Sequence, residues 1–445
     1  MTGTRTIQIL WDASHLWGLM AWRSLRCLGV PCRLCRAEEI ADGGLLGKPQ
    51  HGDDGAAPVL LVPGGNARIK ACRLGARGLA AIREHVACGG VYLGFCGGAG
   101  LALTSRAEGS LNLCPWSRAG YPERLHHLIS GHVRARIASV TSMASTTSMD
   151  GCLPPGAAGA TLSLPVWWPG RFAPQQDGDV RVLATYAGPD TDLWLADLAL
   201  STIPSPVLTA WQEQYGLDLS ADHMDGLPLV VAGRHGQGRY VLSYSHLETP
   251  ASPQANAWLV HILRGLGLEI SSQTEDGIPD WNLDNSAADL PSPDATLVQA
   301  LHDVRALLDM GCEQHLFFRR TPWLWGWRAG LPGAVLNYLH TGLHTALITT
   351  GDLPARENVL AWWRGIAPQF RAACADFVRE AETCLLAYRL RDTVAQSLPD
   401  AVSASELAAR REHIFGHPMT GGGMVDTLLS WLEELIYRAQ DGQDR

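Results

Sequence analysis

The sequence predicts an α/β domain with a doubly wound, mostly parallel sheet, followed by an all-α helical domain. Three observations support this prediction. Up to about residue 270, short apolar and β-branched runs alternate with amphipathic helical patterns, as in folds whose strands are joined by crossover helices. Two of these runs end in glycine-rich turns, where parallel sheets carry their reactive residues. Beyond about residue 295, the apolar positions follow helical spacing only.

Length and composition fit two globular domains. A chain of 445 residues, of which 46% are hydrophobic and 18% charged, has enough apolar material for two cores. We assign residues 1–270 to the α/β domain, 271–294 to a linker and 295–445 to a helical domain of open function. The linker has six acidic residues, no basic ones and several Ser and Pro.

Charge and cysteine usage restrict the partners and the compartment. A net charge of −9 without a basic run offers no surface for a phosphate backbone, so we expect no nucleic-acid partner. No apolar stretch approaches the roughly 18 residues that span a bilayer, so we expect no stable membrane insertion. The 11 cysteines have no repeating spacing, which favours reduced thiols and a cytoplasmic location over a disulfide framework.

The chain begins with a predicted strand over 7–11 and an amphipathic helix over 14–28. Cys27, Cys32 and Cys35 then have the spacing of a plant-type iron–sulfur loop. A cluster loop would lie clear of a strand, however, and the segment around Cys32 and Cys35 fits a second strand. We therefore predict neither a metal site nor a cofactor.

The first glycine-rich turn, Pro63-Gly64-Gly65, follows a short apolar strand over 58–62. Because glycine has no side chain, its backbone N–H group can face a ligand without obstruction. Gly64 and Gly65 are therefore candidates for a substrate-binding turn that forms half of an oxyanion hole. A helix around 77–87 follows, with one apolar face directed at the sheet.

The second turn holds the candidate nucleophile, Cys96. An apolar strand precedes it and an Ala/Leu-rich helical pattern follows, so the cysteine stands on a strand-to-helix turn. This is the arrangement of a nucleophile elbow, in which Gly94 and Gly98 relieve the crowding of strand against helix. The first helical N–H groups, Gly97 among them, favour a thiolate and can bind an oxyanion. The alternative is a buried structural cysteine.

A further strand over 239–245 runs out into His246-x-Glu248. Residues two apart on an extended chain point the same way, so the carboxylate of Glu248 can orient the imidazole of His246. Cys96, His246 and Glu248 are therefore the candidate catalytic nucleophile, base and orienting acid.

Together these motifs resemble the class I glutamine amidotransferase-like superfamily over about residues 5–270. The resemblance rests on the turn 63–65, the elbow 94–98 and His246-x-Glu248, and it implies a flavodoxin-like sheet. Within the superfamily, the chain is most similar to the N-terminal domain of biotin-protein ligases, whose elbow resembles Gly-x-Cys-x-Gly-Ala. The segments 166–172 and 182–186 resemble the strand that this family places before its His-x-Glu hairpin.

Two features depart from these relatives. Glutaminases of the superfamily usually place a Gln four residues after the nucleophile, where this chain has Gly100, so a glutamine pocket is not evident. No biotin-ligase catalytic domain follows, and we interpret the segment 233–239 as a hairpin turn and not a biotin-binding loop. In the family, the segment 105–165 carries loops over the site. We interpret it here as a solvated insertion; the alternative is substrate contact through Tyr121 or Arg124.

The helical domain is predicted to hold about four to six antiparallel helices. Two histidine pairs in it, His340 with His344 and His413 with His417, lack the acid of a zinc-binding helix, so we interpret them as structural or surface residues. The Trp-rich segment 317–328 is predicted to pack between the domains or to bind a protein partner, with a membrane-surface contact as a minor alternative.

The expected chemistry is hydrolysis or acyl transfer at an amide-like carbon of a small-molecule amide or acyl substrate, by a Cys-His-Glu triad. Whether the chain is an enzyme stays open at this point. The main alternative is a non-catalytic binding or scaffolding protein that keeps the fold and acts through its helical domain. A cysteine peptidase or an esterase is a third possibility.

Overall fold

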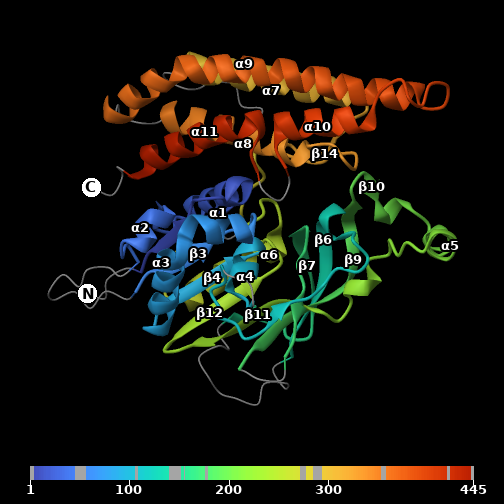
Figure 1. Ribbon diagram of the computed structural model, residues 1–445. Helices are drawn as coiled ribbons and strands as arrows, with labels where there is room; N and C mark the ends of the chain where they lie inside the picture. The colour runs from blue at the N-terminus through green and yellow to red at the C-terminus, as the bar shows by residue number, and fades with distance from the viewer. Residues whose placement is uncertain are drawn as a thin grey trace. The chain divides into compact units, whose positions relative to one another are not determined.

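The computed structural model describes residues 5–45, 57–105, 109–139, 152–154, 156–175, 179–270, 277–283, 293–351, 357–417 and 421–441. The chain divides into two units, Met1–Pro279 and Asp280–Arg445, which we describe separately (Figure 1). Most of the predicted linker 271–294 and part of the predicted insertion 105–165 lie outside the described residues.

A mixed sheet forms the centre of the first unit, in the order β2-β1-β3-β4-β12-β11-β9-β6-β7, with β10 beside β9. One half is parallel and contains β2 (Cys32–Cys35), β1 (Ile7–Leu10), β3 (Val59–Val62), β4 (Val91–Phe95) and β12 (Gly238–Ser243). The other half is antiparallel and contains β11 (Pro228–His235), β9 (Arg181–Leu195), β6 (Ile129–Ile137), β7 (Thr161–Trp167) and β10 (Leu198–Ala199).

The parallel half brings the predicted turns to one edge. Its strands β3 and β4 are buried along their whole length, as near-continuous apolar runs require. Val62 lies opposite Gly94, and Phe95 lies opposite Ser243. The carboxyl ends of β3, β4 and β12 therefore meet, and the residues that follow each strand share one edge of the sheet.

The antiparallel half corrects the prediction of a mostly parallel sheet. Its strands pair antiparallel throughout, β12 with β11, β11 with β9, β9 with β6 and β6 with β7. The segment 233–239 is the β11–β12 hairpin, with His235 opposite Gly238, so the prediction of a turn there is confirmed. The expectation of a parallel sheet thus holds only for the half that carries the candidate site.

Helices and short elements complete the first unit. The helices are α1 (His15–Cys27), α2 (Ala37–Ala41), α3 (Ala67–Ala87), α4 (Gly97–Ala102), α5 (Ser205–Tyr215) and α6 (Pro253–Gly265). The backbone of α3 is non-helical at Gly75, so the helix predicted around 77–87 corresponds to the second part of α3. The first part is capped by the side chain of Asn66, which accepts hydrogen bonds from the backbone N–H groups of Arg68 and Ile69. The short elements are β5 (Ser117–Arg118), β8 (Phe172–Ala173), η1 (His126–Leu128), η4 (Leu200–Thr202) and η5 (Asp222–Met224).

The second unit is largely helical (Figure 1). It contains α7 (Ala295–Glu313), α8 (Gly333–Gly351), α9 (Glu357–Val394), α10 (Ala404–Phe415) and α11 (Gly423–Asp441). None of the described helices has the length and apolar character needed to cross a membrane.

A two-stranded sheet, β13 (Phe317–Arg319) and β14 (Trp325–Trp327), corrects the prediction of an all-α second domain. The Trp-rich segment forms this hairpin, and its Trp325 N–H donates a hydrogen bond of 2.9 Å to the side chain of buried Asn337. Trp323 packs against Trp281, with ring centroids 4.9 Å apart. The partner role of this segment stays a prediction.

Two glycines of α4 give a test of the packing at the elbow. A Cβ atom at Gly98 would lie 2.0 Å from the carbonyl oxygen of Val62, whereas one at Gly100 would make only ordinary contacts, at 3.8 Å or more. We expect Gly98→Ala to lower the free energy of unfolding by about 1–3 kcal/mol, because backbone must shift. Gly100→Ala, the matched control, should change it by less than about 1 kcal/mol. Urea denaturation measures both, and equal losses would contradict the close packing.

Candidate functional site

Cys96 lies between β4 and α4 with a strained backbone, φ 46° and ψ −104°, as the N-cap residue of α4. Its N–H donates a hydrogen bond of 2.7 Å to the carbonyl oxygen of Ser243, at the end of β12. Gly97 follows in close contact with the Pro-Gly-Gly turn, since a Cβ atom there would lie 1.8 Å from the carbonyl oxygen of Gly65. The turn is therefore a strand-to-helix elbow with the side chain of Cys96 at its apex.

The imidazole of His246 and the carboxylate of Glu248 form a buried pair. Nδ1 of His246 lies 2.7 Å from Oε1 of Glu248, and the two side chains are 0% and 1% exposed. With Glu248 on Nδ1, the Nε2 atom is left to face other groups. The two side chains are thus in hydrogen-bond contact, and the orienting role of Glu248 stays a prediction.

Residues that sequence reasoning missed hold this pair in place. The side-chain amide of buried Asn256 donates to the carbonyl oxygens of Leu247 and Thr249, at 2.9 and 2.8 Å. The hydroxyl of Ser24 donates to the carbonyl oxygen of Glu248 at 2.7 Å. Neither residue belongs to a recognisable motif: Ser24 acts through a contact with a segment distant along the chain, and Asn256 bonds the backbone of the turn that precedes its own helix.

Burial and two neighbouring groups determine the protonation of His246. Burial lowers its pKa, but the charge of Glu248 and the nearby thiol of Cys96 raise it, to about 10. The contact between Cys96 and Nε2 lacks the geometry of a hydrogen bond, and Nε2 has no other partner among the described residues. Sγ of Cys96 itself lies 3.7 Å from the carbonyl oxygen of Trp167. The elbow and the His-Glu pair therefore belong to one site.

The indole of Trp17, which sequence reasoning also missed, covers the imidazole. Its ring centroid lies 4.6 Å from that of His246 and 5.6 Å from that of Trp167. Gly64 makes this packing possible, because a Cβ atom there would lie 2.6 Å from Cε1 of His246 and 2.8 Å from Cγ of Trp17. The requirement for glycine at 64 is thus steric.

The backbone N–H groups of Gly65 and Gly97 are available to a ligand. Within the part of the chain that the structure describes, neither donates a hydrogen bond to another backbone group outside the regular elements. Gly65 has φ +104°, which an L-residue rarely adopts, and its backbone touches that of Gly97. The two groups lie at the N-terminus of α4 beside Cys96, where a developing negative charge would be stabilised.

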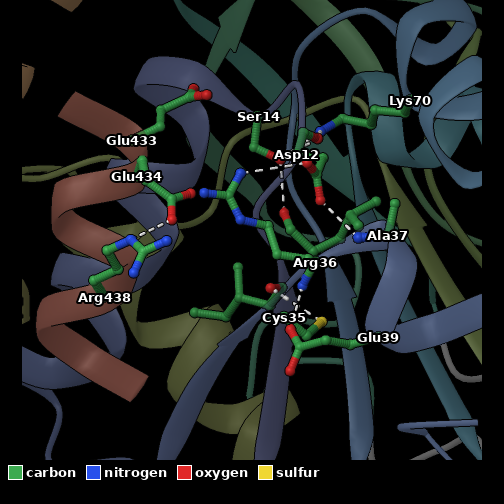
Figure 2. A network of polar contacts seen from close by, with 12 residues as sticks. Asp12, Ser14, Cys35, Arg36, Ala37, Glu39, Lys70, Glu433, Glu434 and Arg438 are labelled. Atoms are coloured by element: carbon green, nitrogen blue, oxygen red, sulfur yellow. Dashed lines mark hydrogen bonds and ion pairs between the residues drawn. The ribbon is translucent and has the colours of Figure 1, made fainter. Parts of the chain in front are cut away.

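A polar network links Asp12, Ser14 and Lys70 around the loop after β1 (Figure 2). The fully buried Lys70 donates a hydrogen bond of 2.5 Å to the hydroxyl of Ser14, and the carboxylate of Asp12 accepts one of 2.6 Å from the N–H of Ala37. These contacts fix the loop after β1, whose Ala13 carbonyl oxygen would lie 2.6 Å from a Cβ atom at Gly65. The network therefore limits where the Gly65 N–H can point.

Part of the predicted insertion packs near the elbow instead of being solvated throughout. The ring of Tyr121 stacks on that of His126, with centroids 3.7 Å apart. The guanidinium groups of Arg118 and Arg171 lie 5.0 and 5.1 Å from the centroid of the Tyr121 ring. Burial and the charge of Arg118 lower the pKa of His126 to about 4, so this imidazole is neutral near pH 7. Arg124 is exposed.

The cysteines and histidines that suggested metal sites do not gather into one. Cys27 ends α1, whereas Cys32 and Cys35 begin and end β2. Among the described residues, no group of three or more His, Cys, Asp or Glu has the geometry to hold a metal ion. All 11 cysteines are free thiols, and Cys72 and Cys88 are the exposed ones.

The raised pKa of His246 predicts how stability depends on pH. Its folded pKa of about 10 exceeds the ordinary value of 6.5, so the stability that protonation contributes is complete below about pH 6.5 and is lost as the pH rises through about 10. We expect Glu248→Gln to lower the free energy of unfolding at neutral pH by about 3 kcal/mol, because the imidazolium loses its buried partner. The variant should also flatten the loss of stability between neutral pH and about pH 10.

Urea denaturation across this pH range, followed for both proteins, measures the effect. Glu213→Gln is the matched control, because Glu213 is an exposed carboxylate on α5 of the same unit. The control should keep the wild-type pH dependence. A Glu248→Gln variant with the same pH slope as wild type would show that the carboxylate does not raise the pKa of His246.

The comparisons with known proteins match part of the chain. No protein-family model matches the chain, and no curated protein matches it significantly. The chain is similar to the solved structure of PurLQS from Thermotoga maritima, with 12% identity and a TM-score of 0.36, over 59% of this chain and 99% of that one. It is also similar to a candidate GMP synthase subunit from Thermoplasma acidophilum, with 14% identity and a TM-score of 0.34, over 60% and 95%. A candidate ThuA-like protein from Bacteroides uniformis matches with 14% identity and a TM-score of 0.35, over 60% and 93%. At these values, the likeness concerns the fold of part of the chain and carries nothing about activity.

Proposed function

We propose that the first unit is a cysteine-dependent amidohydrolase or acyl-transfer enzyme with Cys96 as its nucleophile. The observation that carries the proposal is the convergence of Cys96, His246 and Glu248, which come from two segments about 150 residues apart. A strained elbow, a buried His-Glu pair and a free Nε2 atom beside the thiol form the arrangement that nucleophilic catalysis requires. A merely structural cysteine would need none of these.

The first half of the reaction forms an acyl-enzyme. The raised pKa of His246 favours a resting pair in which the thiol proton resides on the imidazole. The thiolate of Cys96 attacks the carbonyl carbon of the substrate, a C–S bond forms, and the carbonyl electron pair moves to oxygen. His246 then gives its Nε2 proton to the leaving amine or alcohol as the C–N or C–O bond breaks, which leaves a thioester.

The second half releases the acyl group. Water or an acceptor attacks the thioester carbon, His246 takes up the proton of the nucleophile, and the C–S bond breaks to restore the thiolate. In both halves, the N–H groups of Gly65 and Gly97 would donate to the oxyanion. Gly64 would serve the site by making room for His246. The chemistry needs no metal or cofactor.

The substrate class is a small amide or acyl compound. Gly100 stands where the superfamily's glutaminases usually carry Gln, so we do not propose glutamine itself. The elbow Gly94-x-Cys96-x-Gly98-Ala99 supports kinship with the N-terminal domain family of biotin-protein ligases within the class I amidotransferase-like proteins. A thiolate mechanism also fits a reducing, cytoplasmic compartment. Partners of the second unit, including one at 317–328, stay a proposal.

The thiolate pair can be tested with iodoacetamide at about pH 6, where an ordinary thiol is almost entirely protonated. We expect Cys96 to be alkylated at least about 10-fold faster than the exposed Cys72 and Cys88, because only Cys96 has an imidazolium beside it. Peptide mass spectrometry gives the rate at each cysteine. His246→Gln should bring Cys96 down to the rate of the two reference thiols and leave theirs unchanged.

Alkylation of Cys96 no faster than Cys72 and Cys88 in the native protein would exclude the enzyme and favour the binding-module alternative. Once a substrate is found, the leaving group separates the remaining classes. Ammonia indicates an amidohydrolase, an amine a peptidase-like enzyme and an alcohol an esterase.

A further inference from the structure

Arg118 lies beside the candidate site on the small β5–β8 sheet. It stands opposite Phe172 in the register of that sheet. The ring of Phe172 in turn lies 4.5 Å from that of Tyr244, two residues before His246. A short chain of contacts therefore connects the guanidinium with the strand end that carries the catalytic imidazole.

The guanidinium of Arg118 has no anionic partner among the described residues. Its Nε donates a hydrogen bond of 2.8 Å to the hydroxyl of Tyr121, and its side chain is exposed. Arg171 on the other side of the same ring is buried and forms an ion pair with Glu123 through two hydrogen bonds. Of these two cations around Tyr121, only Arg171 is neutralised within the described chain.

Arg118 also lies within electrostatic reach of the nucleophile. Burial lowers the pKa of its guanidinium, but Tyr121, Tyr244 and Cys96 raise it, so that the pKa is above its ordinary value. The guanidinium and the sulfur therefore lie near enough for their charges to interact. A group bound to Arg118 would therefore lie close to Cys96.

The hydroxyl of Tyr244 is a second, independent indication of a ligand. Tyr244 is 2% exposed, and its hydroxyl has no hydrogen-bond partner among the described residues. A buried hydroxyl without a partner is unfavourable unless something absent from the protein itself satisfies it. It lies 3.9 Å from the place of a Cβ atom at Gly100, the position where a larger side chain would occupy the space.

We infer that the acyl compound that reacts at Cys96 carries a carboxylate, which binds the guanidinium of Arg118 and accepts a hydrogen bond from the hydroxyl of Tyr244. A guanidinium without an anionic partner and a buried hydroxyl without any hydrogen-bond partner, close to one nucleophile, match the needs of one carboxylate. Arg118 and Tyr244 would then select the substrate, while the triad performs the chemistry. This inference rests on the proposed function.

Iodoacetate and iodoacetamide test the inference, because they react with the same sulfur and differ in carrying a carboxylate or a neutral amide. We expect the iodoacetate-to-iodoacetamide rate ratio at Cys96 to exceed the ratio at Cys72 and Cys88 by about 10-fold, the size of one charge-assisted hydrogen bond. Arg118→Gln should reduce this excess to within about twofold; the ratio of the two rates cancels any change in the reactivity of the thiolate itself. Tyr244→Phe should reduce it in part.

Arg124→Gln is the matched control, because it removes the same charge from an exposed residue nearby in the chain, and its ratio should stay that of wild type. Arg118→Lys should keep part of the preference, and circular dichroism checks that each variant is folded. Two results would overturn the inference. One is an iodoacetate-to-iodoacetamide rate ratio at Cys96 that equals the ratio at Cys72 and Cys88. The other is an equal reduction of the Cys96 ratio by Arg118→Gln and by Arg124→Gln. In both cases a fast iodoacetamide reaction at Cys96 would leave the proposed function intact, whereas a slow one would remove the proposed function itself.

Discussion

The left-handed backbone of Cys96 is the constraint on which the rest of the candidate site depends. A non-glycine residue in such a conformation costs about 1–3 kcal/mol and persists only where its surroundings enforce it. The enforcing contacts are the hydrogen bond from the Cys96 N–H to Ser243 and the one from the Tyr92 hydroxyl to the carbonyl oxygen of Gly98, both 2.7 Å long. Because Ser243 ends the strand that leads to His246, the same contact that enforces the strain also brings the imidazole near the sulfur.

The glycines around the elbow follow from that strain. A backbone turned so sharply approaches its neighbours closely, and the positions of a Cβ atom at Gly97 and Gly98 fall on the carbonyl oxygens of Gly65 and Val62. Glycine at these positions is therefore a steric requirement before it is a functional one. This packing also affects the candidate site. Because the two turns are in contact through glycine backbone, their N–H groups lie together beside Cys96.

The local motifs of the candidate site could be predicted from the sequence, whereas the tertiary contacts between them could not. The elbow at Cys96, the Pro-Gly-Gly turn and His246-x-Glu248 were predictable because each is a short pattern whose meaning depends on immediate neighbours. Trp17 and Asn256 were not predictable. The amphipathic pattern around Trp17 does not show which distant ring its indole will contact, and no motif marks the asparagine whose amide donates to the carbonyl oxygen of Leu247. The antiparallel half of the sheet and the β13–β14 hairpin were missed for the same reason: strand pairing is decided by packing partners that spacing alone does not identify.

Burial divides the site into a fixed part and an accessible part. His246 and Glu248 are almost completely buried, where low polarity strengthens their attraction and holds the imidazole in one tautomer. Cys96, Gly65 and Gly97 are only half-buried, so the sulfur and the N–H groups can meet an incoming molecule. Arg118 is exposed. Under the proposed function, the buried pair would keep its proton chemistry while the more accessible residues around it could change selectivity.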